Sequence, residues 1–174
     1  ELAVGSCQCC GIFQLVTQPE REKMFHNHYA FFSGTSKAMA AHFQTFVEEV
    51  KRDYCAGPDP FVVEIGSNDG IMLQHFAHAG IRHLGIDPSS NVSDVAREKG
   101  ISTLCRFFNK ETAKEVLEAH GPVAAFIAAN VMCHIPFLHS VLEGIDILLK
   151  PRGIVAFEDP YLGAVVEKTS YDQI

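Results

Sequence analysis

The sequence has little positive charge. Its 174 residues include 14 Lys and Arg against 21 Asp and Glu, a formal net charge of -7 at pH 7 with His neutral. Nucleic-acid surfaces need clustered basic side chains, so this balance argues against DNA or RNA as a partner. No apolar run approaches the roughly 18 residues of a membrane-spanning helix, and no signal peptide opens the chain. We therefore expect no membrane partner and a cytoplasmic location.

Apolar residues, in contrast, are abundant. They make up 47% of the composition, which is enough to fill the core of one compact domain with an appendage. The stretch FVVEIGSNDGIML, residues 61–73, predicts a strand, a glycine turn and the start of a helix. Gly66 and Gly70 bracket this turn, where the missing Cβ lets a ligand approach backbone N–H groups at the helix start. The turn therefore predicts a nucleotide-type binding site.

The residues around the turn distinguish between ligands. A dinucleotide-binding turn has the spacing G-x-G-x-x-G, but Asn68 replaces the middle glycine here and Glu64 stands near the end of the strand. The resulting E-x-G-x-N-x-G is similar to the S-adenosylmethionine (SAM) loop of class I methyltransferases. Taken alone, the loop is equally typical of a glycine-rich turn that binds nothing.

Asp87 favours the ligand-binding interpretation. It follows a second predicted strand, residues 82–86, and lies about twenty residues after the first glycine of the turn. Doubly wound folds place there the carboxylate that binds a ribose diol. Asp87 also precedes Pro88 and Ser89, so capping of the next helix is the competing role.

Strands and helices alternate along the rest of the chain. Five expected strands start at Phe61, Arg82, Ile101, Val123 and Ile154. The expected helices cover residues 37–54, the segment after the glycine turn, 92–99, a stretch ending at 120, and 137–149. This alternation predicts a parallel sheet with right-handed crossovers, an α/β doubly wound domain whose ligand lies at the carboxyl ends of the strands.

Several strands are followed by residues that a sheet does not need. Asn130 and His134 come after the fourth strand, where the methionine part of SAM and the reacting carbon would meet, although His134 is equally typical of a helix start. We expect Phe108, after the third strand, to flank an adenine ring. Because successive side chains along an extended segment point in opposite directions, at least one of Phe107 and Phe108 is expected to be a core residue. The acids at 158–159 are typical of a solvated loop.

Half of the six cysteines lie in one short segment. Cys7 and Cys10 form a C-x-x-C, which is half of a tetrahedral structural zinc site. The other ligands would come from a pair upstream of Glu1 or from His26 or His28, and free thiols without a metal are equally compatible. The scattered cysteines occur in apolar context and are predicted to be small buried or inert thiols: Cys55, Cys105 and Cys133.

The chain divides into three expected segments. Residues 1–33, with a weak hairpin pattern around the cysteines and the aromatic stretch MFHNHYAFF, predict a partial zinc-binding and substrate-facing module. Residues 34–60 supply a connecting helix and a linker that ends in AGPDP, and residues 61–174 form the SAM-binding domain. A complete sheet of this class has two further strands, so we expect the chain to be a fragment of a larger protein or an unusually short variant.

Six segments together resemble the zinc-containing sugar C-methyltransferases of deoxysugar and antibiotic pathways: CQCC, MFHNHYAFFSGTS, GPDPFVVEIGSNDGIML, HLGIDPSS, AANVMCHIP and FEDPYLGAVVEKTSYDQI. The resemblance covers essentially the whole chain. It implies a zinc module, a Rossmann-like class I methyltransferase domain that is incomplete at its C-terminus, and a further C-terminal domain. It also implies methyl transfer to a ring carbon next to the keto group of a nucleotide-linked, typically dTDP-linked, 4-keto-deoxysugar.

The resemblance also implies roles for individual residues. Tyr29 would be the catalytic residue that reaches the sugar, and Cys7 and Cys10 would bind zinc. The histidine that serves this family as general base would follow Ile174. The SAM contacts implied by the resemblance are Gly66, Asn68, Asp87, Ser89 and Asn130. Four further SAM contacts are expected from their positions near the ends of the predicted strands: Glu64, Gly70, Phe108 and His134.

The implied reaction explains why a base is needed. A C–H bond beside a ketone is weakly acidic, so a base removes the proton and the enolate carbon attacks the sulfonium methyl group. An ordinary tyrosine titrates near pH ~10, which makes Tyr29 a poor base. We therefore expect these residues alone to turn over little or no sugar. A SAM-binding module without catalysis is the alternative function, and Glu64 and Asn68 disfavour a third, a nicotinamide-dependent oxidoreductase.

Overall fold

The computed structural model describes residues 3–169 of the chain, and residues 1–2 and 170–174 lie outside this described part. The end of the domain expected over residues 61–174 therefore lies outside the described residues. The same is true of the general base expected after Ile174. Within residues 3–169, no helix is both long enough and apolar enough to cross a bilayer.

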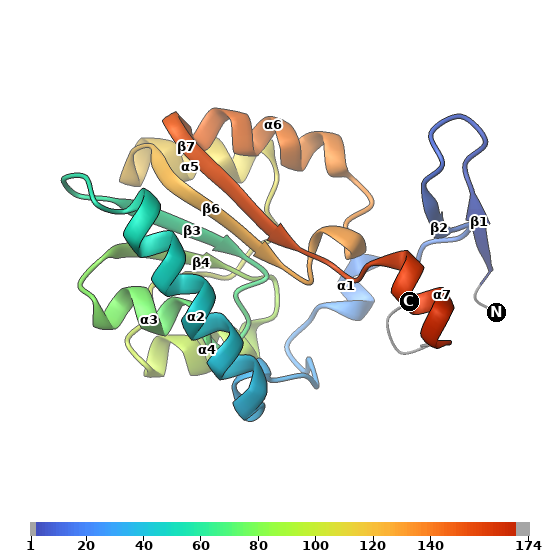
Figure 1. Ribbon diagram of the computed structural model, residues 1–174, viewed down its shortest axis with the longest axis horizontal. Helices are drawn as coiled ribbons and strands as arrows, with labels where there is room; N and C mark the ends of the chain where they lie inside the picture. The colour runs from blue at the N-terminus through green and yellow to red at the C-terminus, as the bar shows by residue number, and fades with distance from the viewer. Residues whose placement is uncertain (1–2, 170–174) are drawn as a thin grey trace.

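Five parallel strands form the central sheet in the order β5-β4-β3-β6-β7 (Figure 1). The strand that comes first in the chain, β3, lies in the middle, paired with β4 on one side and β6 on the other. The order of the chain therefore reverses at β3, which is the switch point of a doubly wound fold. The strands are β3 (Phe61–Ile65), β4 (Arg82–Ile86), β5 (Thr103–Leu104), β6 (Val123–Ala129) and β7 (Leu149–Glu158).

Helices cover both faces of this sheet (Figure 1). Helices α2 (Lys37–Tyr54), α3 (Leu73–His78) and α4 (Ser90–Glu98) pack on one face. Helices α5 (Lys110–His120) and α6 (Leu138–Leu148) pack on the other. All five residues of β3 are buried, as expected for a central parallel strand between two helical layers.

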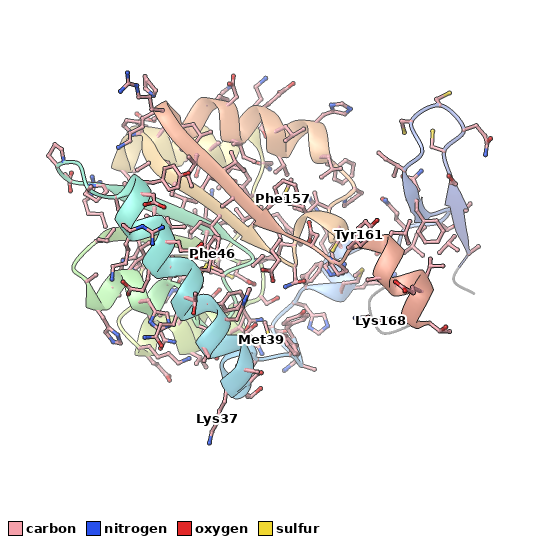
Figure 2. The ribbon with its side chains drawn as sticks, viewed as in Figure 1. Lys37, Met39, Phe46, Phe157, Tyr161 and Lys168 are labelled. Atoms are coloured by element: carbon pink, nitrogen blue, oxygen red, sulfur yellow. The ribbon has the colours of Figure 1, made fainter. Side chains whose placement is uncertain are left out.

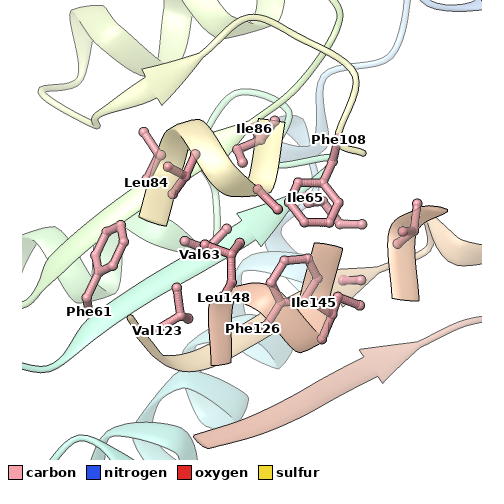
Figure 3. Packing of buried hydrophobic residues seen from close by; sticks show 14 residues of the cluster. Phe61, Val63, Ile65, Leu84, Ile86, Phe108, Val123, Phe126, Ile145 and Leu148 are labelled. Carbon is pink, nitrogen blue, oxygen red and sulfur yellow. The ribbon is translucent and has the colours of Figure 1, made fainter. Parts of the chain in front are cut away.

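The core under α5 and α6 holds the strands that carry the site (Figure 3). Phe126 of β6 is fully buried, and its ring centroid lies 5.1 Å from that of Phe108. Ile145 and Leu148 of α6 pack on the same cluster. Burial of each large apolar side chain contributes about 1.5–3 kcal/mol, so this layer fixes β3 and β6 relative to each other.

The structure confirms the predicted fold class and most element positions. Helix α2 covers the predicted residues 37–54, and Asn109 caps α5 by accepting the N–H of Thr112 at 2.8 Å. Tyr54, the last residue of this helix, is 45% exposed, whereas Phe43, Val47 and Val50 are buried. Strand β5 is shorter than the predicted strand.

Strand β7 starts earlier than predicted. Val123 of β6 pairs with Leu149, and the register shifts before Ala125 pairs with Ile154. The residues around Pro151, which precede the predicted start at Ile154, therefore form an irregularity inside the strand. Proline has no N–H to donate to the ladder, and Arg152 adopts a left-handed conformation with φ 66°, which together explain the shift.

The N-terminal segment forms a small hairpin beside the larger body. Strand β1 (Val4–Ser6) pairs antiparallel with β2 (Phe13–Leu15), and the cysteine-rich turn connects them. No residue from 3 to 20 is buried. A short helix, α1 (Arg21–Met24), and a 3-10 turn, η1 (Ser33–Thr35), lead into α2. Figure 1 shows the hairpin away from the sheet, and the last described helix, α7 (Leu162–Lys168), follows β7.

Strand β7 forms one edge of the sheet and exposes an aromatic side chain. Phe157 is 68% exposed, and with Phe46 of α2 it lines a shallow depression at this edge (Figure 2). The carboxyl ends of β7 and of the other strands point toward the N-terminal segment (Figure 1). That edge of the sheet is where the candidate site lies.

Candidate functional site

A cavity of about 620 Å³ lies at the carboxyl ends of the strands. Small-molecule sites commonly occupy about 300–1,000 Å³, so its size suits a ligand such as a nucleoside derivative. The glycine turn after β3 and the segments after β4, β5, β6 and β7 contribute to its walls, and Arg21, Phe25 and Tyr29 of the N-terminal segment complete them. The cavity therefore occupies the position where doubly wound folds bind ligands.

The glycine turn brings bare backbone to the cavity wall. Gly66 has φ 61° and Gly70 has φ 77°, a left-handed conformation that other residues adopt only with strain. A Cβ atom on Gly66 would overlap the side chain of Val131, and one on Gly70 would overlap Ile101. Because Gly66 and Val131 both line the cavity, the close approach at this point shapes the ligand site itself.

Asp87 joins the end of β4 to the glycine turn. Its Oδ2 accepts the N–H of Asn68 at 2.9 Å, and its Oδ1 accepts the N–H of Ser89 at 2.8 Å. Burial raises the pKa of Asp87, and these two donors act in the opposite direction. Each carboxylate oxygen can accept more than one hydrogen bond, so Asp87 can hold the turn and still accept two ligand hydroxyls.

Glu64 places a second buried carboxyl group at the cavity. Its side chain is 4% exposed, and its Oε2 atom has no hydrogen-bond partner among the described residues. Burial raises the pKa of Glu64 well above its usual range, and the charges of Asp87 and Asp69 raise it further. A buried, unpaired carboxyl group of this kind is suited to receive a cationic ligand group.

Glutamine at position 64 is expected to stabilise the unliganded protein at neutral pH. The folded state keeps the Glu64 proton to higher pH than the unfolded state, so wild-type stability falls as pH rises above the ordinary value of 4.5. Glutamine cannot ionise, and its advantage should grow by at most ~1.4 kcal/mol per pH unit until the folded pKa is reached. Thermal unfolding without ligand, from about pH 5 to pH 8, measures this difference.

The matched control for this prediction is the exposed acid Glu118, also replaced by glutamine. Its pH profile of unfolding should follow that of the wild type, because an exposed carboxyl group loses little hydration on folding. Parallel pH profiles for the wild type and Glu64→Gln would show that the buried carboxyl group is not destabilising.

Residues 29–34, here called the strap, lie across the glycine turn. The Asn68 side chain accepts the N–H of Ser33 at 3.0 Å and donates to the carbonyl of Phe31 at 3.0 Å. The Asp69 carboxylate accepts the N–H of Gly34 at 3.1 Å and forms an ion pair with Lys99 at 3.1 Å. The polar side chains of the turn therefore fix the strap, and the Asn68 amide is engaged with it.

Asn91 holds the strap at its other end. Its Oδ1 accepts the N–H of Tyr29 at 3.2 Å, and its Nδ2 donates to the carbonyl of Tyr29 at 2.8 Å. This reciprocal pair positions Tyr29 beside the cavity. Burial raises the pKa of Tyr29, and the charge of Asp87, which lines the same cavity, raises it further.

The remaining sequence-predicted residues occupy different positions. Asn130, with φ 55°, lines the cavity and donates its N–H to the carbonyl of Glu158 at 2.6 Å. His134, at the end of the 3-10 turn η2 (Met132–His134), lines it too, with its ring centroid 6.5 Å from that of Phe25. Ser89 and Gly70 do not line the cavity but shape the loop beside it.

The aromatic pair after β5 divides between core and cavity. Phe108 packs against Phe126 in the core and is 8% exposed, although one side of it borders the cavity. Phe107 is half-buried and also lines the cavity, with the guanidinium of Arg21 over its ring. Alternation predicted at least one core residue in this pair, and that residue is Phe108, which was expected to flank the adenine ring; Phe107 is the less buried of the two at the cavity.

The cysteine turn offers only part of a metal site. Cys7 and Cys10 lie in the hairpin turn, where hydrogen bonds from Cys10 and then Cys9 lower the pKa of the Cys7 thiol. From residue 3 to residue 169, no three His, Cys, Asp or Glu side chains gather closely enough to hold a metal ion. The described residues thus fit at most half of a tetrahedral zinc site.

The scattered cysteines do not share one environment. Cys55 is buried, as predicted, and Cys105 is half-buried. Cys133 is exposed, so it is not a buried thiol, but desolvation and then Asp159 raise the pKa of its thiol to about 12, which agrees with the alternative of an inert thiol. It lies in the turn η2, between the cavity-lining residues Val131 and His134.

Comparisons with known proteins identify the family of the chain. A family model described as a methyltransferase domain matches residues 22–172. The C-methyltransferase NovU of Streptomyces niveus is 31% identical over 173 residues, which cover 99% of this chain and 41% of NovU. The chain therefore spans less than half the length of this relative.

Solved structures share the fold at low sequence identity. The plantazolicin methyltransferase BpumL in complex with SAH has a TM-score of 0.57 and 15% identity, over 76% of this chain and 50% of BpumL. DesVI of Streptomyces venezuelae has a TM-score of 0.56 and 15% identity, over 83% and 59% of the two chains. Because the methyltransferase-domain model matches residues 22–172, most of this chain, the chain belongs to the methyltransferase-domain family.

Proposed function

We propose that the protein is a SAM-dependent C-methyltransferase that acts on a ring carbon next to the keto group of a nucleotide-linked 4-keto-deoxysugar. The similarity to the C-methyltransferase NovU over 99% of the chain is the observation that carries this proposal. The cavity at the sheet switch point supports it, because it combines a glycine turn with a buried strand-end acid.

The described residues fit SAM. Asp87 would accept the two ribose hydroxyls while it keeps its hydrogen bonds to the turn. Gly66 lets the ligand approach the backbone, and Glu64 faces the cavity with a carboxyl oxygen that no described residue satisfies. Phe107 and Phe108 border the space for an adenine ring, and Asn130 and His134 border the methionine end. When bound, SAM supplies an electrophilic methyl group.

The acceptor needs a different set of groups. A base takes the proton from the carbon beside the ketone, that carbon forms the bond to the methyl group, and the bond from methyl to sulfur breaks to leave a neutral thioether. The raised pKa of Tyr29 keeps its phenol protonated at neutral pH. Tyr29 is therefore suited to donate a hydrogen bond to the sugar and unsuited to remove the proton.

A structural zinc ion bound by Cys7 and Cys10 is a separate part of the proposal. A thiol with a lowered pKa more readily provides the thiolate that zinc requires. Two thiolates do not complete a tetrahedral site, so no step of the reaction depends on this metal. Metal analysis of the protein and of Cys7→Ser tests it, and an equal zinc content in both would contradict it.

Two measurements test the methyltransferase proposal. Calorimetric titration should show that the chain binds SAM and does not bind NAD, because Asn68 and Glu64 replace features of a dinucleotide turn. Incubation of the full-length protein with methyl-labelled SAM and a dTDP-4-keto-deoxysugar should place the label on a ring carbon. Label on a hydroxyl oxygen, or NAD binding in place of SAM, would refute the assignment.

A further inference from the structure

Arg21 is a half-buried cation in the cavity wall, and nothing in the reaction outlined above uses it. Among residues 3–169, it is the only lysine or arginine that lines the cavity. Its side chain is 36% exposed, and its ion pair is with the neighbouring Glu22, whose side chain is 64% exposed. Exposed pairs of this kind contribute little, so Glu22 leaves the charge of Arg21 largely available.

Two aromatic rings fix the orientation of this guanidinium. Its central carbon lies 4.3 Å from the ring centroid of Phe107 and 5.6 Å from that of Phe137. Stacking on aromatic rings occupies the flat faces of a guanidinium and leaves its N–H edge free. The Nε atom of Arg21 donates to Glu22 at 2.8 Å, and no described residue accepts from the two Nη groups. That edge therefore has several unused donors.

The charges of the cavity come from different parts of the chain. The acids Glu64 and Asp87 come from the carboxyl ends of β3 and β4, whereas Arg21 comes from the N-terminal segment. Carboxyl groups suit the positively charged sulfonium nucleoside, which carries no phosphate. A cation with a free N–H edge suits an anion, and planar guanidinium groups bind phosphate oxygens in a bidentate manner.

We propose that Arg21 binds the diphosphate of the methyl acceptor and so makes the protein select nucleoside-diphosphate sugars over free sugars. This inference rests on the proposed function, since it assigns the anion to the acceptor rather than to the cofactor. The N-terminal segment then has two separate roles, with Arg21 at the diphosphate and Tyr29 at the sugar. Arg21 acts in binding and takes no part in the proton or methyl transfer.

The test measures binding to the SAH-saturated protein, so that the nucleoside cannot enter the cofactor space. The probes are dTDP, inorganic pyrophosphate and thymidine. The wild type should bind dTDP, and Arg21→Gln should weaken dTDP binding about tenfold or more, because a hydrogen-bonded charge is lost. Arg21→Lys keeps the charge but lacks the planar guanidinium group, so its dTDP affinity should lie between those of the wild type and Arg21→Gln. Thymidine should bind weakly to all three proteins.

Arg106→Gln is the matched control. Arg106 is next to Phe107 in sequence, is exposed, pairs with Glu115 at 2.6 Å and does not line the cavity. Its dTDP affinity should equal that of the wild type. An unchanged circular dichroism spectrum shows that each variant is folded. An SAH affinity within about twofold of the wild type shows that its cofactor space is intact.

Each outcome decides the inference. Loss of dTDP affinity in Arg21→Gln, with SAH affinity retained, supports it even if no sugar is methylated, which would count against the proposed function alone. Equal dTDP affinity in Arg21→Gln and the wild type overturns the inference. It is also overturned if the wild-type protein binds thymidine as tightly as dTDP, or if it binds neither thymidine nor dTDP. Weakened SAH binding in Arg21→Gln overturns it too, because Arg21 would then contact the cofactor.

Discussion

Alanine at position 87 is expected to weaken SAM binding by two orders of magnitude or more. A hydrogen bond to a charged group contributes about 1.5–3 kcal/mol, so loss of two ribose contacts to Asp87 corresponds to a factor of roughly 10²–10⁴. The same change leaves the N–H groups of Asn68 and Ser89 without their acceptor. The turn is then less ordered before the ligand arrives, which weakens binding further. Calorimetric titration with SAM measures the loss.

Two further variants separate these contributions. Asp87→Asn keeps the shape and one acceptor oxygen, so it should bind SAM more tightly than Asp87→Ala but less tightly than the wild type. Asp94→Ala removes an exposed acid of α4 that pairs with Arg97, and it should leave SAM binding unchanged. A SAM affinity of Asp87→Ala within about threefold of the wild type would show that this carboxylate does not hold the ribose.

Alanine at position 66 is expected to close the cofactor space from inside. The new methyl group would overlap Val131, and both residues line the cavity. The left-handed backbone at φ 61° adds a cost of about 1–2 kcal/mol for any residue with a Cβ. To relieve the overlap, the turn or the segment after β6 must shift, and either movement displaces ligand contacts. We expect SAM affinity to fall by about 100-fold, which is ~2.7 kcal/mol.

Gly80 provides a matched control for Gly66. It has a similar φ of 68°, but a Cβ there would meet nothing within 4 Å. Gly80→Ala should therefore lose about 1–2 kcal/mol of stability and keep its SAM affinity. In Gly66→Ala with Val131→Ala, the overlap with the Val131 methyl group is removed and only a tight contact of 3.2 Å to the Cβ of residue 131 remains, so part of the affinity should return. If Gly66→Ala binds SAM as well as Gly80→Ala does, the turn does not contact the ligand.

The sequence was sufficient to predict the sheet and its ligand-binding edge, because both depend on local patterns. Strand β4 has the predicted bounds, and Glu64 is buried at the point where the glycine turn begins. Gly66 and Asp87 line the same cavity because parallel strands end at one edge. Strand periodicity and glycine spacing are short-range signals, and hydrophobic burial on both faces of the sheet reinforces them.

The contribution of the N-terminal segment could not be predicted in this way. Asn91 had no distinguishing pattern, since its hydrogen bonds reach Tyr29, 62 residues earlier in the chain. Arg21 lies in a four-residue helix, and its proposed role depends on a ring from the loop after β5. For Asn68, the motif indicated a ligand contact, and Asn68 does line the cavity; that its side chain also holds the strap had no local signal. Such contacts are set by tertiary packing, which local spacing does not encode.

The strap couples two parts of the molecule that lie 35 residues apart in sequence. If the strap opened, Asn68 and Asp69 would lose partners for their buried polar groups, so the strap and the turn should open as one cooperative unit. A nucleoside bound on the turn would then slow amide hydrogen exchange in residues 29–34, including amides that it does not touch. Binding of the methyl donor at the turn would in this way order the strap, which faces the methyl acceptor, by reducing the conformational entropy of the chain alone.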